Sequence, residues 1–230
     1  MKTIGLIGGM SWESTVPYYR AVNEAVRARL GGLHSAKLVL YSVDFEQIER
    51  LQRTDRWDVA GVVLGDAARA LASAGADFLV ICANTMHRVA PAIEAAAGLP
   101  LLHIADATAE AILAAGHRRV GLLGTRYTME QEFYRERLMR PHGLEVLVPE
   151  ASDREVVHRV IFDELCRGKI LESSRAEYRR VIAALVARGA EAVILGCTEI
   201  SLLVDAADAS VPLFDTTAIH ARRAVDWALA

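Results

Sequence analysis

The stretch Gly75–Thr85, GADFLVICANT, decides the fold, because it predicts the end of a helix, a buried strand and a small polar turn. The stretch Gly189–Glu199, GAEAVILGCTE, follows the same order 114 residues later (189 − 75). Each has Gly-Ala-acid where a helix should stop, then an apolar run, then small polar residues with a cysteine among them. The echo predicts two related halves that hold one small substrate in a cleft between them.

Two further pairs of segments support a tandem duplication. Ile4–Met10, IGLIGGM, resembles Val120–Arg126, VGLLGTR, at an offset of 116 residues (121 − 5). Leu99–Leu102, LPLL, and Val211–Phe214, VPLF, form a third and weaker pair. The alternative is that buried strands resemble one another in any α/β chain, but the shared order and nearly constant offset favour duplication.

Apolar runs alternate with helical patterns along the whole chain, which is typical of an α/β fold with parallel sheets. We expect two similar Rossmann-like lobes, with mainly parallel sheets and a pseudo-twofold relation. The first lobe is expected to comprise residues 1–100 plus 211–230, and the second residues 101–210. The predicted strands lie near residues 2–8, 37–43, 77–82, 100–104, 118–123, 144–147, 190–196 and 211–214. The predicted helices lie near residues 14–30, 55–74, 86–97, 106–115, 128–140, 153–166, 173–188 and 216–229.

The composition excludes several classes of function. A net charge of −3 gives no electrostatic reason to expect a nucleic-acid partner. Three cysteines without a CxxC pair argue against zinc and against a disulfide framework, so we expect no metal and a reduced, cytoplasmic setting. No apolar run approaches the roughly 20 residues that span a bilayer, so no membrane contact is expected.

No cofactor is expected either. The glycines near the first strand do not form G-x-G-x-x-G, and the chain has no Walker A sequence. Pyridoxal phosphate needs a Schiff-base lysine, and none of the three lysines, Lys2, Lys37 and Lys169, is well placed for that task.

Ligands of parallel sheets bind beyond the carboxyl ends of the strands, and small polar residues gather there. They are Gly8, Gly9, Met10, Ser11, Cys82, Ala83, Asn84 and Thr85 in the first half, and Gly124, Thr125, Arg126, Gly196, Cys197, Thr198 and Glu199 in the second. Because helix N-termini carry partial positive charge, such a surface suits a carboxylate.

Cys197 is the stronger candidate for thiol chemistry, since a following helix would stabilise its thiolate. Its alternative role is core packing, which is common for free cysteine. Cys82 is ambiguous: the repeat aligns it with Gly196 and aligns Ala83 with Cys197, and successive strand side chains point to opposite faces. Cys166 is expected to pack near a helix end.

The motifs of this chain resemble those of the aspartate/glutamate racemase family, and most closely its branch specific for L-aspartate and L-glutamate. The resemblance lies in Gly8–Thr15 (GGMSWEST), Cys82–His87 (CANTMH), Gly124–Met129 (GTRYTM), Gly196–Glu199 (GCTE) and Phe214–His220 (FDTTAIH). It implies two α/β lobes, a homodimer, no cofactor, and one acid/base residue at a strand end of each lobe. It also implies racemisation of an amino acid by thiol-based removal and return of the α-hydrogen.

The chain departs from the family pattern at Ala83, where members place cysteine or threonine immediately before Asn-Thr. Alanine has no proton to exchange, so three interpretations remain open. Cys82 substitutes from one residue earlier, the enzyme works from one side only, or the chain binds its ligand without catalysis. A one-thiol decarboxylase or isomerase of a small diacid is the alternative enzyme class.

The resemblance extends to substrate-binding residues. It implies carboxylate and ammonium contacts from Asn84, Thr85, Thr125 and Thr198, with Met10 above the site. Among Arg50, Gln52 and Arg53 one is expected to meet the side-chain carboxylate of the substrate, unless they form a solvated helix face. Glu199 is expected to polarise Cys197 or to cap a helix, and His87 and His220 are expected to be structural.

Overall fold

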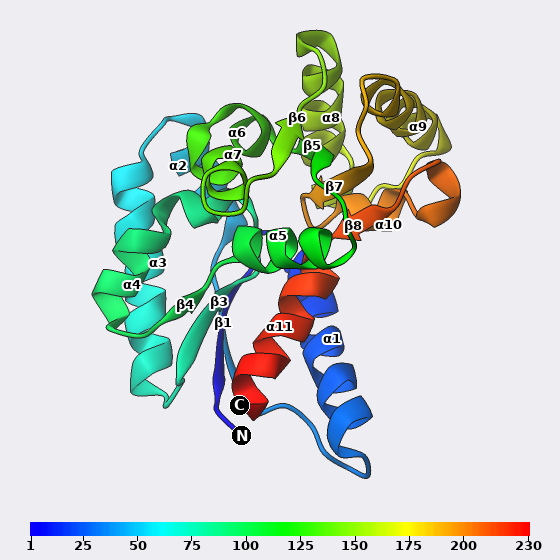
Figure 1. Cartoon of the computed structure of the whole chain (residues 1–230). Coiled ribbons are helices and arrows are strands. Elements are labelled where there is room, and N and C mark those ends of the chain that lie inside the picture. The colour runs from blue at the N-terminus through cyan, green and yellow to red at the C-terminus, as the bar shows by residue number, and fades with distance from the viewer. The chain divides into compact units, whose positions relative to one another are not determined.

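The computed structural model describes all 230 residues and contains two four-stranded sheets whose strands are all parallel (Figure 1). The predicted α/β class is therefore confirmed. The strands are β1 Ile4–Gly8, β2 Leu38–Ser42, β3 Phe78–Ile81, β4 Leu101–Leu102, β5 Arg119–Gly124, β6 Glu145–Leu147, β7 Ala192–Gly196 and β8 Leu213–Asp215. The α-helices are α1 Trp12–Leu30, α2 Phe45–Arg53, α3 Trp57–Ser73, α4 Ala90–Ala97, α5 Ile104–Ala114, α6 Arg126–Glu130, α7 Glu132–Met139, α8 Ala151–Asp163, α9 Glu172–Ala187, α10 Ile200–Leu203 and α11 Thr216–Leu229. Three 3₁₀ turns are η1 Thr85–Val89, η2 Leu165–Arg167 and η3 Ala206–Asp208.

The two sheets repeat one topology. Their strand orders are β2-β1-β3-β4 and β6-β5-β7-β8, which are the same order shifted by four strands. The register is repeated as well: Gly5 pairs with Leu79 across β1 and β3, and Gly121 pairs with Val193 across β5 and β7. These pairs are related by the offsets of 116 and 114 residues seen in the sequence, so the duplication extends to the hydrogen-bond ladder.

The chain divides into two compact units, residues 1–104 with 220–230, and residues 105–219. This division differs from the lobes expected from the sequence at both points where the chain passes from one unit to the other. Strand β4 pairs with β3, so residues 101–104 belong to the first unit. Strand β8 pairs with β7, so residues 211–219 belong to the second unit, and only α11 from His220 onward returns to the first.

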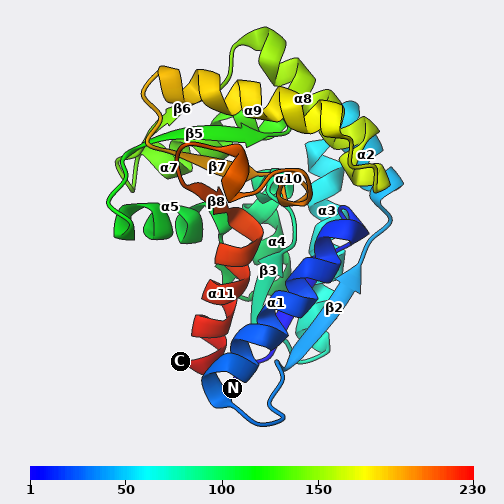
Figure 2. The same cartoon turned by 90° about the vertical axis from the view of Figure 1, so that its right-hand side faces the viewer.

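The first sheet is covered on both faces, as parallel sheets require. Helices α1 and α11 bury apolar side chains against one face, in a cluster that joins Tyr18 and Val22 to Ala224 and Val225 (Figure 2). Helix α3 packs on β1 and β2 and also on α4. Its glycines allow that close approach, because a Cβ at Gly65 would lie 2.9 Å from the Cβ of Ala96.

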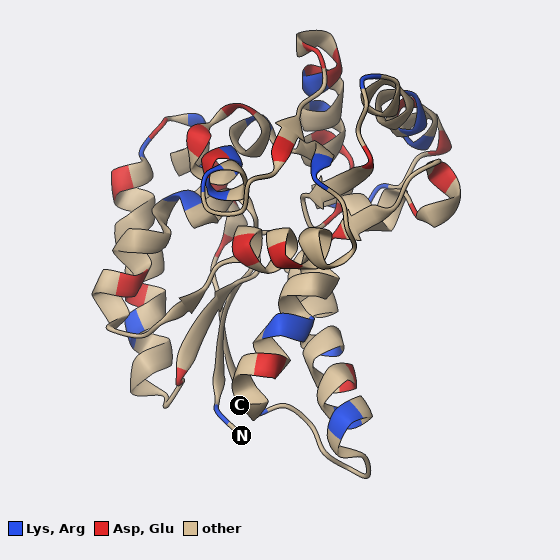
Figure 3. Cartoon of the chain, viewed as in Figure 1, with Lys and Arg blue, Asp and Glu red and all other residues tan.

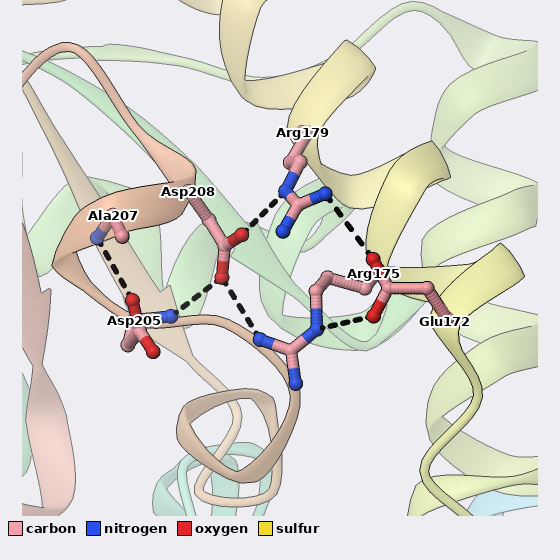
Figure 4. Close-up of polar contacts among 6 residues, drawn as sticks. All are labelled: Glu172, Arg175, Arg179, Asp205, Ala207 and Asp208. Carbon is pink, nitrogen blue, oxygen red and sulfur yellow. Dashed lines mark hydrogen bonds and ion pairs between the residues drawn. The ribbon is translucent and has the colours of Figure 1, made fainter.

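The second unit has its own core, made by α8, α9 and α10 against β5 and β7. A network of ion pairs between side chains lies at η3 in this unit (Figure 4). The Asp208 carboxylate, whose side chain is 1% exposed, accepts hydrogen bonds from the guanidinium groups of Arg175 and Arg179 and from the backbone N–H of Asp205. These contacts tie the segment between β7 and β8 to α9.

The sequence prediction missed helix α2. The Asp44 side chain caps it by accepting a hydrogen bond from the N–H of Glu46 at 3.2 Å. The helix predicted over residues 128–140 is two helices, because Gln131 adopts an extended conformation between α6 and α7.

None of the helices is both long and apolar enough to cross a membrane. Acidic and basic side chains are interspersed in each unit, in line with the net charge of −3 (Figure 3).

Candidate active site

Cys197 follows β7 directly and lies in a network of hydrogen bonds within the second unit. Its Sγ donates to Oε2 of Glu199 at 2.9 Å, and Oγ1 of Thr198 donates to the same oxygen at 2.8 Å. Glu199 is 2% exposed and Cys197 is 8% exposed. The three consecutive residues that the sequence singled out are therefore joined through one buried carboxylate.

The environment of Cys197 disfavours its thiolate form. Burial raises the pKa of Cys197 well above its usual value, and the nearby Glu199 carboxylate raises it further. Since a thiolate is the form that removes a proton from carbon, the thiol needs a partner that accepts its proton. The Glu199 oxygen at 2.9 Å is placed to be that partner.

Cys166 also reaches this carboxylate, which the sequence analysis did not foresee. Its Sγ donates to Oε1 of Glu199 at 3.7 Å, from the turn η2. No motif in the sequence joins these two residues, which are 33 positions apart.

Thr125 stands at the corresponding end of β5 and caps helix α6. Its Oγ1 accepts a hydrogen bond from the N–H of Thr128 at 3.3 Å. The ends of β5 and β7 approach closely: a Cβ added at Gly196 would lie 2.7 Å from the carbonyl oxygen of Leu123. Thr125 and Cys197 thus follow the ends of two neighbouring strands, β5 and β7.

The structure places the Cys82 thiol in the apolar core of the first unit. It is 0% exposed and packs in the cluster that includes Leu6, Tyr18 and Val80. Burial alone raises the pKa of Cys82 far above its usual value. This position does not support the acid/base role that the sequence analysis left open for Cys82, because a side chain enclosed by apolar groups does not reach a substrate.

Ala83 and the two residues after it form the turn that ends β3. Ala83, Asn84 and Thr85 are all buried. Through the repeat, the pairing of β3 with β1 and of β7 with β5 places Ala83 at the position that Cys197 occupies in the second unit. A methyl group stands where the other half has a thiol.

Buried histidines support this turn. The Nδ1 of His87 lies 2.8 Å from the carbonyl oxygen of Ala83, and its Nε2 accepts a hydrogen bond from the N–H of Ile104 at 3.2 Å. His87 therefore carries its proton on Nδ1 and donates it to Ala83. Burial lowers the pKa of His87 well below its usual value, and the neighbouring His103 and His220 lower it further. The expected structural role of His87 is thus to hold the end of β3.

Met10 lies at the end of β1, buried beside Gly9. The N–H of Gly9 donates to Oγ1 of Thr15 at 2.8 Å. Gly9 has φ +89°, and a Cβ there would lie 2.3 Å from the carbonyl oxygen of Val43. Only glycine fits this turn, which brings the backbone before Met10 close to the end of β2.

On helix α2, the buried polar residue is Gln52. Its Nε2 lies 3.0 Å from Sδ of Met86 in η1, so the amide reaches the turn that follows β3. Arg50 and Arg53 are exposed, and Arg53 pairs with Glu49 on the helix surface. The structure thus gathers Met10, Gln52, Asn84 and Thr85 around the carboxyl end of the first sheet, and leaves both arginines in solvent.

Comparisons with known proteins agree on one family. A family model described as Asp/Glu/hydantoin racemase matches residues 7–224. The curated "Broad specificity amino-acid racemase RacX" of Bacillus subtilis (strain 168) is 23% identical over 237 residues, which cover 99% of this chain and 98% of that protein.

Two solved structures are similar over the full length of both chains. One comes from Yersinia pestis, is described as a candidate Asp/Glu racemase, and has 62% identity and a TM-score of 0.93. The other is an aspartate racemase homologue from Pyrococcus horikoshii OT3, with 38% identity and a TM-score of 0.85. Each comparison covers 100% of this chain and 100% of the other.

Proposed function

Because the chain belongs to the Asp/Glu/hydantoin racemase family, we propose that it exchanges the α-hydrogen of aspartate or glutamate without a cofactor, with Cys197 as the acid/base. The observation that carries the proposal is the Cys197 thiol at the end of β7, hydrogen-bonded to the buried Glu199 carboxylate at 2.9 Å. An amino acid is the substrate class named for the Bacillus relative.

In the proposed reaction, Glu199 first takes the proton of Cys197, which leaves a thiolate and a neutral carboxyl group. The thiolate removes the α-proton, and the electron pair of the C–H bond stays on the α-carbon as a carbanion. Neutralisation and orientation of the substrate α-carboxylate lower the energy of that carbanion. Return of a proton to the α-carbon completes the exchange, and no atom is gained or lost.

Small polar groups at the two strand edges are proposed to hold the substrate. Thr125 and Thr198 in the second unit, and Asn84 and Thr85 in the first, offer hydroxyl, amide and backbone groups suited to carboxylate and ammonium ions. Gln52 is proposed to contact the side-chain carboxylate of the substrate, because it is the buried polar residue of its helix and its amide reaches the turn after β3. Met10 supplies an apolar surface beside them.

No cofactor is needed for this chemistry, and the chain offers no obvious site for pyridoxal phosphate. Lys2, Lys37 and Lys169 are all exposed, whereas a Schiff-base lysine is usually enclosed with its cofactor. We also propose, from the family likeness, that the protein forms a homodimer in the cytoplasm.

Racemisation requires proton transfer on both faces of the α-carbon, but of the two equivalent positions only Cys197, and not Ala83, has a proton to transfer. The methyl group of Ala83 cannot give or take a proton, and the Cys82 thiol lies in the apolar core. We therefore propose that Cys197 exchanges hydrogen on one face and that inversion is slow. The expected product in D₂O is an α-deuterated amino acid of unchanged configuration.

The variant Ala83→Cys tests this proposal, because it restores a thiol at the position equivalent to Cys197. Chiral chromatography of L-aspartate, D-aspartate, L-glutamate and D-glutamate after incubation should show inversion at least ten times faster in Ala83→Cys than in the natural chain. Cys82→Ala should leave the rate unchanged. Fast inversion by the natural chain that is lost in Cys82→Ala would contradict the account.

A second candidate function is decarboxylation or isomerisation of a small diacid by one thiol. The single thiol at Cys197, opposite a methyl group in the repeat, favours it, because such a reaction needs proton delivery to one face only. Release of CO₂ from malonate-type acids, without exchange at the α-carbon of amino acids, would identify it. Binding of dicarboxylates without either reaction would identify a catalytically silent homologue.

A further inference from the structure

We propose that Cys166 is a positioning residue, whose thiol holds the Glu199 carboxylate in the orientation needed to exchange a proton with Cys197. The inference rests on the proposed function of Cys197 and adds a residue that lies outside every recognised motif of the chain.

The division of donors between the two carboxylate oxygens supports this role. Oε2 of Glu199 accepts hydrogen bonds from Cys197 and Thr198, at 2.9 and 2.8 Å. Oε1 accepts from Cys166 at 3.7 Å, on the other side of the group. With donors on both sides, the carboxylate resists rotation about its last side-chain bond, and Oε2 stays directed at the thiol of Cys197.

Cys166 is itself held firmly by the turn η2. Leu165 is buried in the core of the second unit, and Cys166 packs against the same cluster. The N–H of Gly168 donates to the carbonyl of Leu165 at 3.0 Å, and the N–H of Lys169 donates to that of Glu164 at 2.9 Å. The backbone around Cys166 is thus fixed by packing and by hydrogen bonds, so its thiol is a stable anchor for Glu199.

Tyr178, within electrostatic reach of Glu199, and Glu164, two residues before Cys166, have their own partners. Tyr178 on α9 donates its hydroxyl to the carbonyl of Val157 at 3.1 Å. Glu164 accepts from Oγ of Ser174 at 2.5 Å and lies 3.9 Å from the guanidinium of Arg159. The Tyr178 hydroxyl and the Glu164 carboxylate are therefore engaged in contacts of their own.

A hydrogen bond to a carboxylate favours its ionised form. Loss of the Cys166 thiol should therefore let Glu199 take up its proton at a higher pH. A serine at this position keeps a donor and should preserve the titration.

Difference infrared spectroscopy during a pH titration tests the inference without reference to activity. The band of the protonated Glu199 carboxyl is identified by its absence in Glu199→Gln. It should appear at a higher pH in Cys166→Ala than in the natural chain, and Cys166→Ser should restore the original position. Cys82→Ala, which removes a thiol from the other unit, is the matched control and should not move the band.

The pH profile of α-hydrogen exchange gives a second reading. Its acidic limb should move to higher pH in Cys166→Ala and return in Cys166→Ser. An unmoved carboxyl band in Cys166→Ala would overturn the inference, as would equal shifts in Cys166→Ala and Cys166→Ser. If no substrate is exchanged, the proposed function fails, while the infrared titration still decides whether Cys166 controls Glu199.

Discussion

Among single residues, Cys197 and Ala83 show the contrast that matters most for the proposed chemistry. The two residues occupy equivalent positions in a duplicated fold, one with an ionisable side chain and one with a methyl group. The contrast is visible because both ladders keep the same register. One thiol with one carboxylate partner suffices for proton exchange on one face of a substrate.

The Glu199 carboxylate should control the acidity of Cys197. In Glu199→Gln, the negative charge that disfavours the thiolate is gone, so the pKa of Cys197 should fall, although burial still keeps it raised. The pH dependence of iodoacetamide labelling of Cys197, followed by peptide mass spectrometry, measures this. Glu191→Gln changes a glutamate at the opposite end of β7 and should leave the labelling profile in place.

The sequence was sufficient to find this group but not its geometry. Gly196–Glu199 stood out through the repeat, and Cys197, Thr198 and Glu199 are indeed joined by hydrogen bonds. The placement of Cys82 required coordinates, because a strand residue one step from the turn can face either the core or the edge. The role of Cys166 could not be predicted from the sequence, since its contact with Glu199 depends on how η2 packs against α8 and α10.

Among the secondary-structure elements, the turns after the strands position the site residues. The start of the helix that follows fixes the conformation of such a turn, as Thr125 does between β5 and α6. The strand and helix pattern was largely predictable because apolar runs and Gly-Ala-acid junctions alternate regularly. Helix α2 was missed because Phe45–Arg53 is short and largely polar, with Ile48 and Gln52 as its buried residues. A burial pattern of two residues in nine is too sparse to identify from sequence.

The turn at Gly9 should be intolerant of a side chain. Gly9→Ala combines a left-handed φ of +89° with a Cβ 2.3 Å from the carbonyl oxygen of Val43, so it should lower the free energy of unfolding by about 2–4 kcal/mol. Urea denaturation followed by circular dichroism measures this loss. Gly31→Ala, with φ +73° and open space around the Cβ, should cost about 1 kcal/mol. Equal losses in the two variants would show that the contact with Val43 is not the cause.

The ion group around Asp208 should stabilise the loop that precedes β8. Asp208→Ala leaves the guanidinium groups of Arg175 and Arg179 without a buried acceptor and should lower the free energy of unfolding by about 2–4 kcal/mol (Figure 4). Glu172→Gln removes an exposed partner of the same arginines and should cost under about 1 kcal/mol. Thermal and urea unfolding of both variants compares these losses, and a smaller effect for Asp208→Ala than for Glu172→Gln would refute the assignment.

At the scale of the whole molecule, a tandem duplication has given two units of identical strand order and register. The sequence showed the repeat, but its proposed lobe boundaries differ from the observed units because strand pairing, rather than similarity, decides where β4 and β8 belong.

In the first unit, His220 connects three elements. Its Nε2 donates to the carbonyl of Leu102 at 2.9 Å, and its Nδ1 accepts from the hydroxyl of Tyr18 at 2.8 Å.

These buried histidines should make the protein sensitive to acid. Burial lowers the pKa of His220 to about 4, against 6.5 for an exposed histidine, so the unfolded chain binds more protons between these values. The contribution, about 3 kcal/mol, is fully present above pH 6.5 and is lost as the pH falls toward 4. His220→Gln should flatten this dependence in urea unfolding between pH 7 and 4, whereas exposed His34→Gln should not. An unchanged slope in His220→Gln would contradict this assignment.

The proposed function depends on the transfer of a hydrogen by Cys197 at the α-carbon of an acidic amino acid. Mass spectrometry of aspartate and glutamate incubated in D₂O measures that event directly, whether or not configuration changes. The natural chain should introduce one deuterium at the α-carbon of at least one enantiomer, and Cys197→Ser should slow this by at least a hundredfold. Deuterium uptake at the same rate in Cys197→Ser, or none with any of the four amino acids, would contradict the account.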